Sequence, residues 1–358
     1  MNLLITAVAA FLVCATLLLV LRPVAVAVGL VDRPGGHKRH RGDIPVIGGI
    51  AIFGGVAIAA LMTESLGQYG VMLLVTSAML VGLGVVDDRF DLPASVRLMG
   101  HLTAAMLLVS GSGYQVSSLG DLFGVGALSL GWLAWPFTVV ACIALINAFN
   151  MLDGMDGLAG GVALVAFVGM VALSSGHGGS DSALLVATCM VGALSAFLLF
   201  NVPTSRNRSV RTFMGDAGST LLGFVVAALS LGMVQSNHAD INPVCILWLV
   251  PIPIFELFAS TTRRLRQGKS PLAADNSHFH HRLMVAGFSV RAIFFTYFTF
   301  TLLSVAGSVT ACRMGVPEPV MFGGFCVLFA LWMGFVAVAH RVVRYLPQGW
   351  RREHQTWA

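Results

Sequence analysis

Four oxygen-bearing side chains recur at every third position of one short stretch, residues 147–160 (NAFNMLDGMDGLAG), and they are Asn147, Asn150, Asp153 and Asp156. The stretch closes one apolar run and opens the next, and carboxylates at such a place are costly unless something compensates them. On a helix this spacing drifts slowly around one face, whereas Gly154 and Gly157 favour a bend. The pattern therefore predicts either a cluster of oxygen ligands or a polar turn between helices.

Aspartates also occur at two other boundaries between polar and apolar sequence. Asp87 and Asp88 are adjacent, and adjacent carboxylates repel, which suits a divalent cation or a shared proton. Asp216 stands among glycines with Arg211 just upstream, a combination that suits metal and phosphate. Because hard cations prefer carboxylate oxygens, we expect Asp87, Asp88 and Asp216 to hold Mg²⁺ or Mn²⁺. A solvated helix end is the alternative for the adjacent pair.

A basic loop could bind phosphate near the N-terminus. Residues 30–45 mix Pro and Gly with Lys38 and His40, and basic groups beside flexible backbone suit phosphate. An ordinary positively charged loop of a membrane protein is the alternative.

Three histidines lie within four positions of residues 277–283 (SHFHHRL). His278, His280 and His281 could bind a metal, hydrogen-bond a phosphate or move a proton near neutral pH. The pattern is a weak zinc signal because no Cys accompanies it. A structural role is the alternative.

One acid lies inside an otherwise apolar run. Glu256 follows Pro251 and Pro253, which predict a broken helix whose backbone lines a cavity. Alternatively, Glu256 is a structural partner of Arg263 or Arg264.

Composition assigns the class of protein that must position these residues. The 358-residue chain is 57% hydrophobic and 10% charged, with a mean hydropathy of +0.86, whereas soluble domains are about 25% charged. The chain is therefore expected to be an all-α polytopic membrane protein with a single domain over residues 1–358. Its net charge of +5 is attributed to orientation and contact with anionic lipid, not to nucleic-acid binding.

Eleven apolar runs are long enough to cross a bilayer as helices. They are residues 1–21, 44–63, 65–86, 98–120, 122–152, 157–180, 182–205, 217–239, 241–262, 292–312 and 319–340, of which only 241–262 contains a charge, Glu256. We therefore expect about eleven transmembrane helices. Residues 111–131, rich in Gly and Ser, predict a short external hairpin.

The basic residues predict the orientation. With eleven crossings, the segments that connect the spans lie alternately on the two sides of the membrane. One side holds 20 of the 21 Lys and Arg residues, and the other holds only Arg313. The positive-inside rule then places the C-terminus in the cytoplasm and the N-terminus outside. The acidic clusters share the basic side, so a cytoplasmic-face active site is expected.

Four motifs together, DDRFD, NAFNMLDGMDGLAG, FMGDAGS and SHFHHRL, resemble the polyprenyl-phosphate N-acetylhexosamine-1-phosphate transferases. Within that superfamily the chain looks most like the bacterial undecaprenyl-phosphate N-acetylglucosamine-1-phosphate transferases that start O-antigen, enterobacterial common antigen or teichoic acid synthesis. The resemblance covers about residues 31–288. It implies a multi-pass inner-membrane enzyme that uses Mg²⁺ or Mn²⁺, takes UDP-GlcNAc and undecaprenyl phosphate, and releases UMP. A homodimer is one expected assembly.

The resemblance also assigns roles by position. It implies roles for the acidic motifs and the histidine motif. The residues expected to be catalytic are Asp87, Asp88, Asp153, Asp156, His280 and His281, and those expected to bind metal are Asp87, Asp88 and Asp216. The residues expected to bind substrate are Lys38, His40, Asn150, Arg211, Arg264 and His278. The chain departs from the family at Ser95, where a lysine is common, which leaves Arg97 or Arg89 as the nearest cation. It departs again at Glu256, where an aspartate is common.

Two alternatives differ from this assignment. The phospho-MurNAc-pentapeptide transferases of the same superfamily have three consecutive histidines, whereas Phe279 interrupts the run here. An ion or metabolite transporter would also carry intramembrane acids. Such acids should lie near the middle of the membrane, but all except Glu256 stand at the ends of apolar runs, which favours the transferase.

Overall fold

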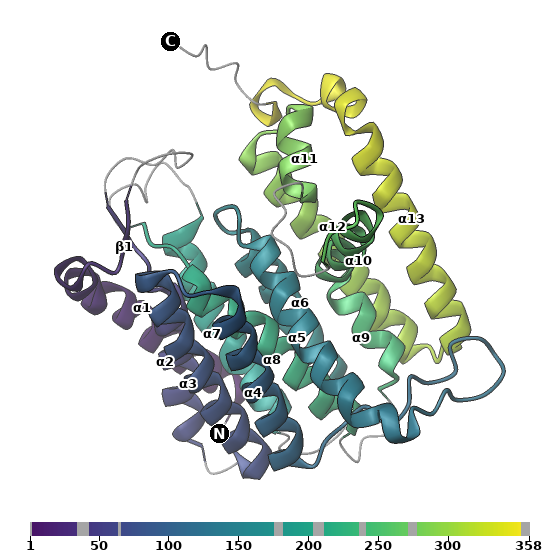
Figure 1. Ribbon diagram of the computed structural model, residues 1–358, viewed down its shortest axis with the longest axis horizontal. Coiled ribbons are helices and arrows are strands. Elements are labelled where there is room, and N and C mark those ends of the chain that lie inside the picture. The colour runs from purple at the N-terminus through teal and green to yellow at the C-terminus, as the bar shows by residue number, and fades with distance from the viewer. Residues whose placement is uncertain are drawn as a thin grey trace.

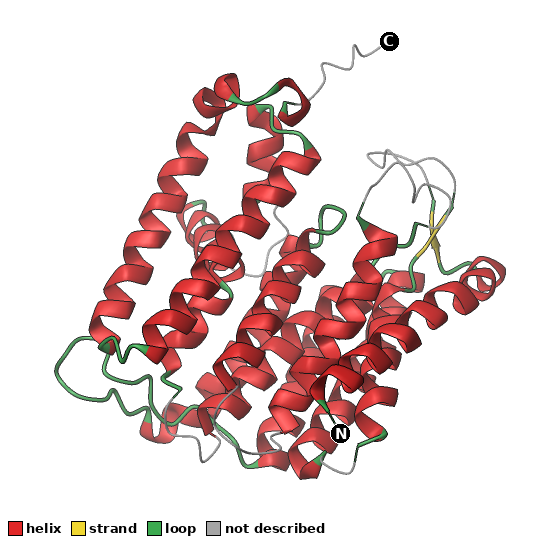
Figure 2. Cartoon of the chain, turned by 180° about the vertical axis from the view of Figure 1, so that it is seen from behind, coloured by secondary structure: helices red, strands yellow, loops and turns green. Residues whose placement is uncertain are grey.

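A computed structural model describes residues 2–33, 43–63, 66–174, 182–202, 211–235, 241–270 and 278–351, and this part of the chain is almost entirely helical (Figures 1 and 2). The helices are α1 (Leu3–Val28), α2 (Gly48–Leu61), α3 (Gly67–Phe90), α4 (Ala94–Ser112), α5 (Ala134–Leu152), α6 (Leu158–Ser174), α7 (Ser182–Asn201), α8 (Gly215–Gln235), α9 (Pro243–Leu249), α10 (Pro251–Arg266), α11 (Phe279–Ala286), α12 (Val290–Arg313) and α13 (Glu318–Val342). Three short 3₁₀ helices are η1 (Gly131–Leu133), η2 (Val343–Tyr345) and η3 (Gln348–Trp350). The expected all-α class is confirmed.

Each of the eleven apolar runs contains helix, but the helices differ in length. Among the described residues, eight helices are long and apolar enough to cross a membrane, or nine if the bent pair α9 and α10 is one span. The apolar helices α2 and α6 are shorter, with 14 and 17 residues. The chain is thus a multi-pass membrane protein, and the number of eleven crossings stays a prediction.

The run 241–262 does not form one straight helix. Helices α9 and α10 meet at Val250 with a bend of 86°. Val250 has non-helical backbone angles, and Pro251 begins α10, where the missing N–H of proline removes no helical hydrogen bond. The broken helix expected from Pro251 and Pro253 is therefore present.

Two small extended elements accompany the helices. Strands β1 (Val31–Asp32) and β2 (Ile44–Pro45) pair in antiparallel fashion, and the sequence analysis did not foresee them because two-residue strands have no periodicity. Between α4 and α5, the expected hairpin is reduced to one antiparallel bridge between Ser118 and Ser129.

Helix α8 forms the centre of the bundle. Its span is 94% buried, whereas the spans of α1 and α13 are only 22% buried and lie at the periphery. Helix α8 packs against α3 and α5 through glycines. A Cβ at Gly84 would collide with the backbone of Ala217, and one at Gly223 with the backbone of Ile146. Small residues thus let the helices that carry the acidic motifs approach closely.

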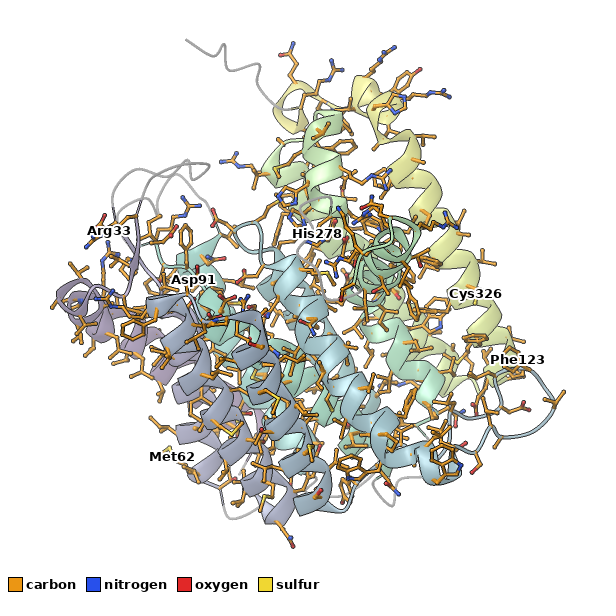
Figure 3. All side chains as sticks on the ribbon, viewed as in Figure 1. Arg33, Met62, Asp91, Phe123, His278 and Cys326 are labelled. Carbon is orange, nitrogen blue, oxygen red and sulfur yellow. The ribbon has the colours of Figure 1, made fainter. Side chains whose placement is uncertain are left out.

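The sequence motifs gather toward one end of the bundle. Figure 3 shows Asp91, just after the Asp87 and Asp88 pair, and His278 toward the same end, while Met62 and Phe123 lie toward the other. Helix α13 ends at the Asp91 end, whereas α1 begins nearer the other (Figure 1). The candidate site is therefore built where α3, α5, α8 and α11 begin or end.

Candidate active site

Asp88 connects the end of α3 to the beginning of α8. Its Oδ1 accepts the backbone N–H of Asp216 at 2.8 Å, and its Oδ2 accepts that of Ala217 at 3.3 Å. A carboxylate at this place satisfies N–H groups that have no partner within the helix and complements the positive end of the helix dipole. Gly215, at φ 74°, lies so near Asp88 that a Cβ there would collide with Oδ2. The motif FMGDAGS therefore needs its glycine for both conformation and space.

Asp87, the other half of the pair, is buried and held by a cation. Its Oδ1 accepts the N–H of Leu92 at 2.8 Å, and its Oδ2 lies 3.3 Å from Nη1 of Arg97. Of the two arginines near Ser95, Arg97 is therefore the one that pairs with Asp87. The guanidinium of Arg89 lies over the ring of Phe90 instead. The ion pair compensates a charge that burial would otherwise make costly.

Asp216 and Asp153 complete an acidic cluster at this end. Asp216 lies in the first turn of α8, beside the negative charge of Asp87. Asp153 follows the last residue of α5 and is half-buried. Burial, together with the negative charges of Asp216 and Asp88, raises the pKa of Asp153 to about 8. The cluster therefore carries more negative charge than the local arginine neutralises.

This donor set fits a hard divalent cation. Among the described residues no three His, Cys, Asp or Glu side chains are arranged to hold a metal ion by themselves. Mg²⁺, however, is usually held by one or two carboxylates together with water and substrate phosphates. A bound cation would offset the repulsion between the negative charges of Asp216 and Asp87 and would lower the raised pKa of Asp153.

Asp156 is paired with Arg211, and both are residues that the sequence analysis singled out. Arg211 Nη2 forms an ion pair with Asp156 Oδ2, and the guanidinium lies over the ring of Phe213 at 5.3 Å from its centroid. Burial lowers the pKa of Arg211 below its ordinary value. Its Nε is buried with no hydrogen-bond partner among the described residues, so this arginine keeps a donor for a ligand.

Asn201 is a positioning residue that the sequence analysis missed. Its Oδ1 accepts the N–H of Gly157 at 2.6 Å, and its Nδ2 donates to the carbonyl of Thr212 at 2.8 Å. It thereby joins the stretch 147–160 to the segment that carries Arg211. The only signal in the sequence is an amide at the end of the apolar run 182–205. Asn150, which the sequence did single out, accepts from Thr220 of α8 at 3.5 Å.

The segment after the basic loop joins the site. Phe213 donates its N–H to Pro45 at 2.9 Å, and Gly48 donates to Phe213 at the same distance. Lys38 and His40 themselves lie outside the described residues.

The bend before α10 turns its polar face toward the site. Glu256, Ser260 and Arg264 follow one another at intervals of four residues, and all three are buried. Ser260 Oγ lies 3.5 Å from Met151 Sδ, and Arg264 Nη2 lies 3.9 Å from the same sulfur. Arg264 therefore approaches the acidic stretch, as expected for a residue near the substrate.

Glu256 holds the histidine motif. Its Oε1 lies 2.9 Å from Nδ1 of His278, and its Oε2 accepts the N–H of Phe279 at 2.8 Å. Glu256 thus has partners in the histidine motif, and the alternative from the sequence, a pairing with Arg263 or Arg264, stays a prediction. The Phe279 side chain is buried against the edge of Trp332, which gives a physical reason for the interruption of the histidine run.

His280 extends the histidine motif to the acidic stretch. A Cβ at Gly154 would lie 2.5 Å from His280 Nε2. His280 is 1% exposed, and neither ring nitrogen has a hydrogen-bond partner among the described residues. Burial and the neighbouring His281 and His278 lower the pKa of His280 to about 3, so the ring is neutral at neutral pH. Its ring centroid is 4.2 Å from that of His281.

The chain is similar to known transferases over most of its length. Residues 70–234 match the model of the family described as glycosyl transferase family 4. The chain is 37% identical over 343 residues to the undecaprenyl-phosphate alpha-N-acetylglucosaminyl 1-phosphate transferase of Yersinia pestis, covering 96% of this chain and 93% of the relative. It is 35% identical to the proteins of that name from Escherichia coli K12, over 96% and 93% of the two chains, and Haemophilus influenzae, over 94% of each.

Proposed function

The chain belongs to the family of undecaprenyl-phosphate alpha-N-acetylglucosaminyl 1-phosphate transferases, and from this premise we propose that it transfers N-acetylglucosamine 1-phosphate from UDP-GlcNAc to undecaprenyl phosphate. The product is a lipid-linked pyrophosphoryl sugar that starts a cell-surface polysaccharide, and UMP is released. The observation that carries the proposal is the convergence of all four sequence motifs, from α3, α5, α8 and α11, at one end of the bundle.

In the proposed reaction an oxygen of the lipid phosphate attacks the phosphorus that bears the sugar. A new P–O bond forms there, the bond from this phosphorus to the bridging oxygen breaks, and UMP leaves with the electron pair. Both substrates are anions, so the site must neutralise charge. We propose that Arg211 and Arg264 bind phosphate oxygens, Arg211 through its Nε, which has no hydrogen-bond partner among the described residues. The neutral His280 offers a ring nitrogen to the same groups.

We propose that Mg²⁺, or Mn²⁺, is the cofactor and that Asp216, with Asp87 and Asp88, would hold it. When bound, the cation neutralises pyrophosphate oxygens and the leaving group. Asp88 at the same time fixes the first turn of α8, so the Asp216 side chain starts from a defined position. Asp153 and Asp156 line the neighbouring stretch, where Asp156 orients Arg211.

We further propose an inner-membrane location, with the C-terminus and the site on the cytoplasmic side, the N-terminus outside and a homodimer as the assembly. The basic residues support the orientation. UDP-GlcNAc is proposed as the donor in preference to UDP-MurNAc-pentapeptide because Phe279 separates the histidines and is buried as an anchor of α11. The relatives are transferases by name, which supports group transfer over transport.

The test is a transfer assay with purified protein, radiolabelled UDP-GlcNAc and undecaprenyl phosphate. Labelled lipid and an equal amount of UMP are expected. UDP-MurNAc-pentapeptide should neither compete nor be transferred, since unpaired polar groups can cost several orders of magnitude in specificity. Equal turnover of the pentapeptide donor would assign the chain to the other branch of the superfamily.

A further inference from the structure

The contact between Glu256 and His278 defines which nitrogen of His278 is available. The Glu256 side chain is fully buried, and an ionised carboxylate can only accept hydrogen bonds. Nδ1 of His278 must therefore carry the hydrogen that lies toward Oε1 at 2.9 Å. The other ring nitrogen, Nε2, is left for a ligand, and in the doubly protonated ring it carries an N–H that can donate to a phosphate oxygen.

The same carboxylate holds the backbone beside that ring. Oε2 accepts the N–H of Phe279 at 2.8 Å, and the Phe279 ring is anchored against Trp332. The first turn of α11 is thus held on one side by an apolar contact and on the other by Glu256. His278 cannot turn without losing the bond from Nδ1.

A buried carboxylate is costly, so its presence needs a reason beyond capping a helix. The N-terminus of α11 could be capped by a neutral Ser, Thr or Asn at no such cost. What a carboxylate adds is a strong acceptor for an imidazole N–H, which orients the ring and increases the basicity of its other nitrogen. The ring so oriented is stacked with that of His280, at 5.8 Å between centroids and 22° between planes, and His280 contacts the acidic stretch at Gly154.

We propose that Glu256 is a positioning residue that acts through His278 and directs its Nε2 toward the pyrophosphate of the nucleotide sugar. This inference rests on the proposed function, because it assigns a role at the same site. It also divides the motif into an oriented member, His278, and a buried neutral member, His280.

The test is a double-mutant cycle with Glu256→Gln, His278→Ala and the combination of both. Glutamine keeps the size of the side chain but has one acceptor oxygen in place of two. Its NH₂ group would therefore face either Nδ1–H of His278 or the backbone N–H of Phe279. Glu256→Gln should raise the KM for UDP-GlcNAc about tenfold or more, the effect expected when a partner that orients a histidine is lost. The KM for undecaprenyl phosphate should not change, and the double variant should be no worse than His278→Ala. Glu256→Asp, which keeps a carboxylate, should retain more activity than Glu256→Gln.

Several outcomes would overturn the inference. Wild-type kinetics of the Glu256→Gln enzyme would overturn it. So would a double variant whose loss of activity equals the product of the losses in the two single variants. A lower kcat with both KM values unchanged would indicate only a smaller folded fraction. If circular dichroism in detergent shows that Glu256→Gln does not fold, Glu256→Asp is the test. The inference then requires that Glu256→Asp raises the KM for UDP-GlcNAc and leaves the KM for undecaprenyl phosphate unchanged.

Binding measurements separate this inference from the proposed function. Calorimetric titration with UDP-GlcNAc should show the same non-additive losses of affinity, whereas UMP, which lacks the sugar phosphate, should bind all variants alike. A wild-type protein that shows this binding pattern but no transfer would refute the reaction and keep the role of Glu256. Transfer by the wild type with unaltered binding in the variants would refute the role of Glu256 alone.

Discussion

The side chain of Asp88 accepts the backbone N–H of Asp216 at 2.8 Å, although 128 residues separate them in the chain. One acidic motif therefore builds the helix end that presents the other. A substitution at Asp88 acts on both the charge of the cluster and the position of Asp216.

Asp88→Asn and Asp88→Ala should separate these two contributions. Asparagine keeps one acceptor oxygen for the N–H of Asp216 but places its NH₂ against the longer contact from Ala217, so Asp88→Asn should lower the unfolding temperature less than Asp88→Ala does, while transfer falls about a hundredfold or more. Asp88→Ala should lose activity and also about 1 kcal/mol of stability, the typical value of a helix cap. Transfer assays and thermal unfolding in detergent measure both. Wild-type turnover by Asp88→Asn would show that Asp88 only caps α8 and that its charge is not needed for transfer.

Chelation of divalent cations should abolish transfer, and Mg²⁺ should restore it. Asp216→Asn removes a proposed ligand, so it should lower kcat about a hundredfold or more at limiting Mg²⁺ without unfolding the protein. Activity is measured against Mg²⁺ concentration for both proteins. Superimposable curves would exclude Asp216 as a ligand.

Asp153 predicts a dependence of stability on pH. Its pKa is raised to about 8 from the ordinary 3.8, so between these values the folded state binds more protons than the unfolded state. Stability from this group is therefore fully present below about pH 4 and is lost progressively as the pH rises from there to about 8. Without divalent cations, Asp153→Asn should be more stable than wild type at pH 8 and similar at about pH 4. An equal difference in unfolding temperature across this range would contradict the assignment.

Gly154→Ala tests the contact between the acidic stretch and the histidine motif. The new methyl group would lie 2.5 Å from Nε2 of His280, and this ring is buried, so the ring must move. Transfer should fall about ten- to a hundredfold, as expected for a small displacement at a site. Gly82→Ala is the matched control, because a Cβ at Gly82 meets nothing within 4 Å. Equal activity of the two variants would show that His280 moves at no cost.

The orientation predicts opposite faces for the two termini. A reporter that is active only outside the cytoplasm should give no signal when fused after Ala358, since the expected eleven-span topology puts 20 of the 21 basic residues on the side of the C-terminus. The same reporter fused before Met1 should be active. The reverse pattern would refute both the orientation and the cytoplasmic site.

The helices and the acidic motifs could be predicted because their signals are local. Uncharged runs mark the helices, and a carboxylate at the end of such a run is conspicuous. Partners distant in sequence could not be predicted. The contact of Glu256 with His278 depends on the bend at Val250, and the two bonds of Asn201 join segments 44 and 11 residues away. The roles assigned to individual site residues stay predictions, and Lys38 and His40 lie outside the described residues.

The burial of α8 has a consequence for motion. A helix covered on nearly every face, with glycine contacts to α3 and α5, has no room to slide or rotate. Rearrangement during a turnover should therefore fall on α11, which packs chiefly against α12 and α13 and reaches the acidic stretch through His280. Amide hydrogen exchange should accordingly be slowest in α8 and faster in α11, and nucleotide binding should slow it chiefly in α11.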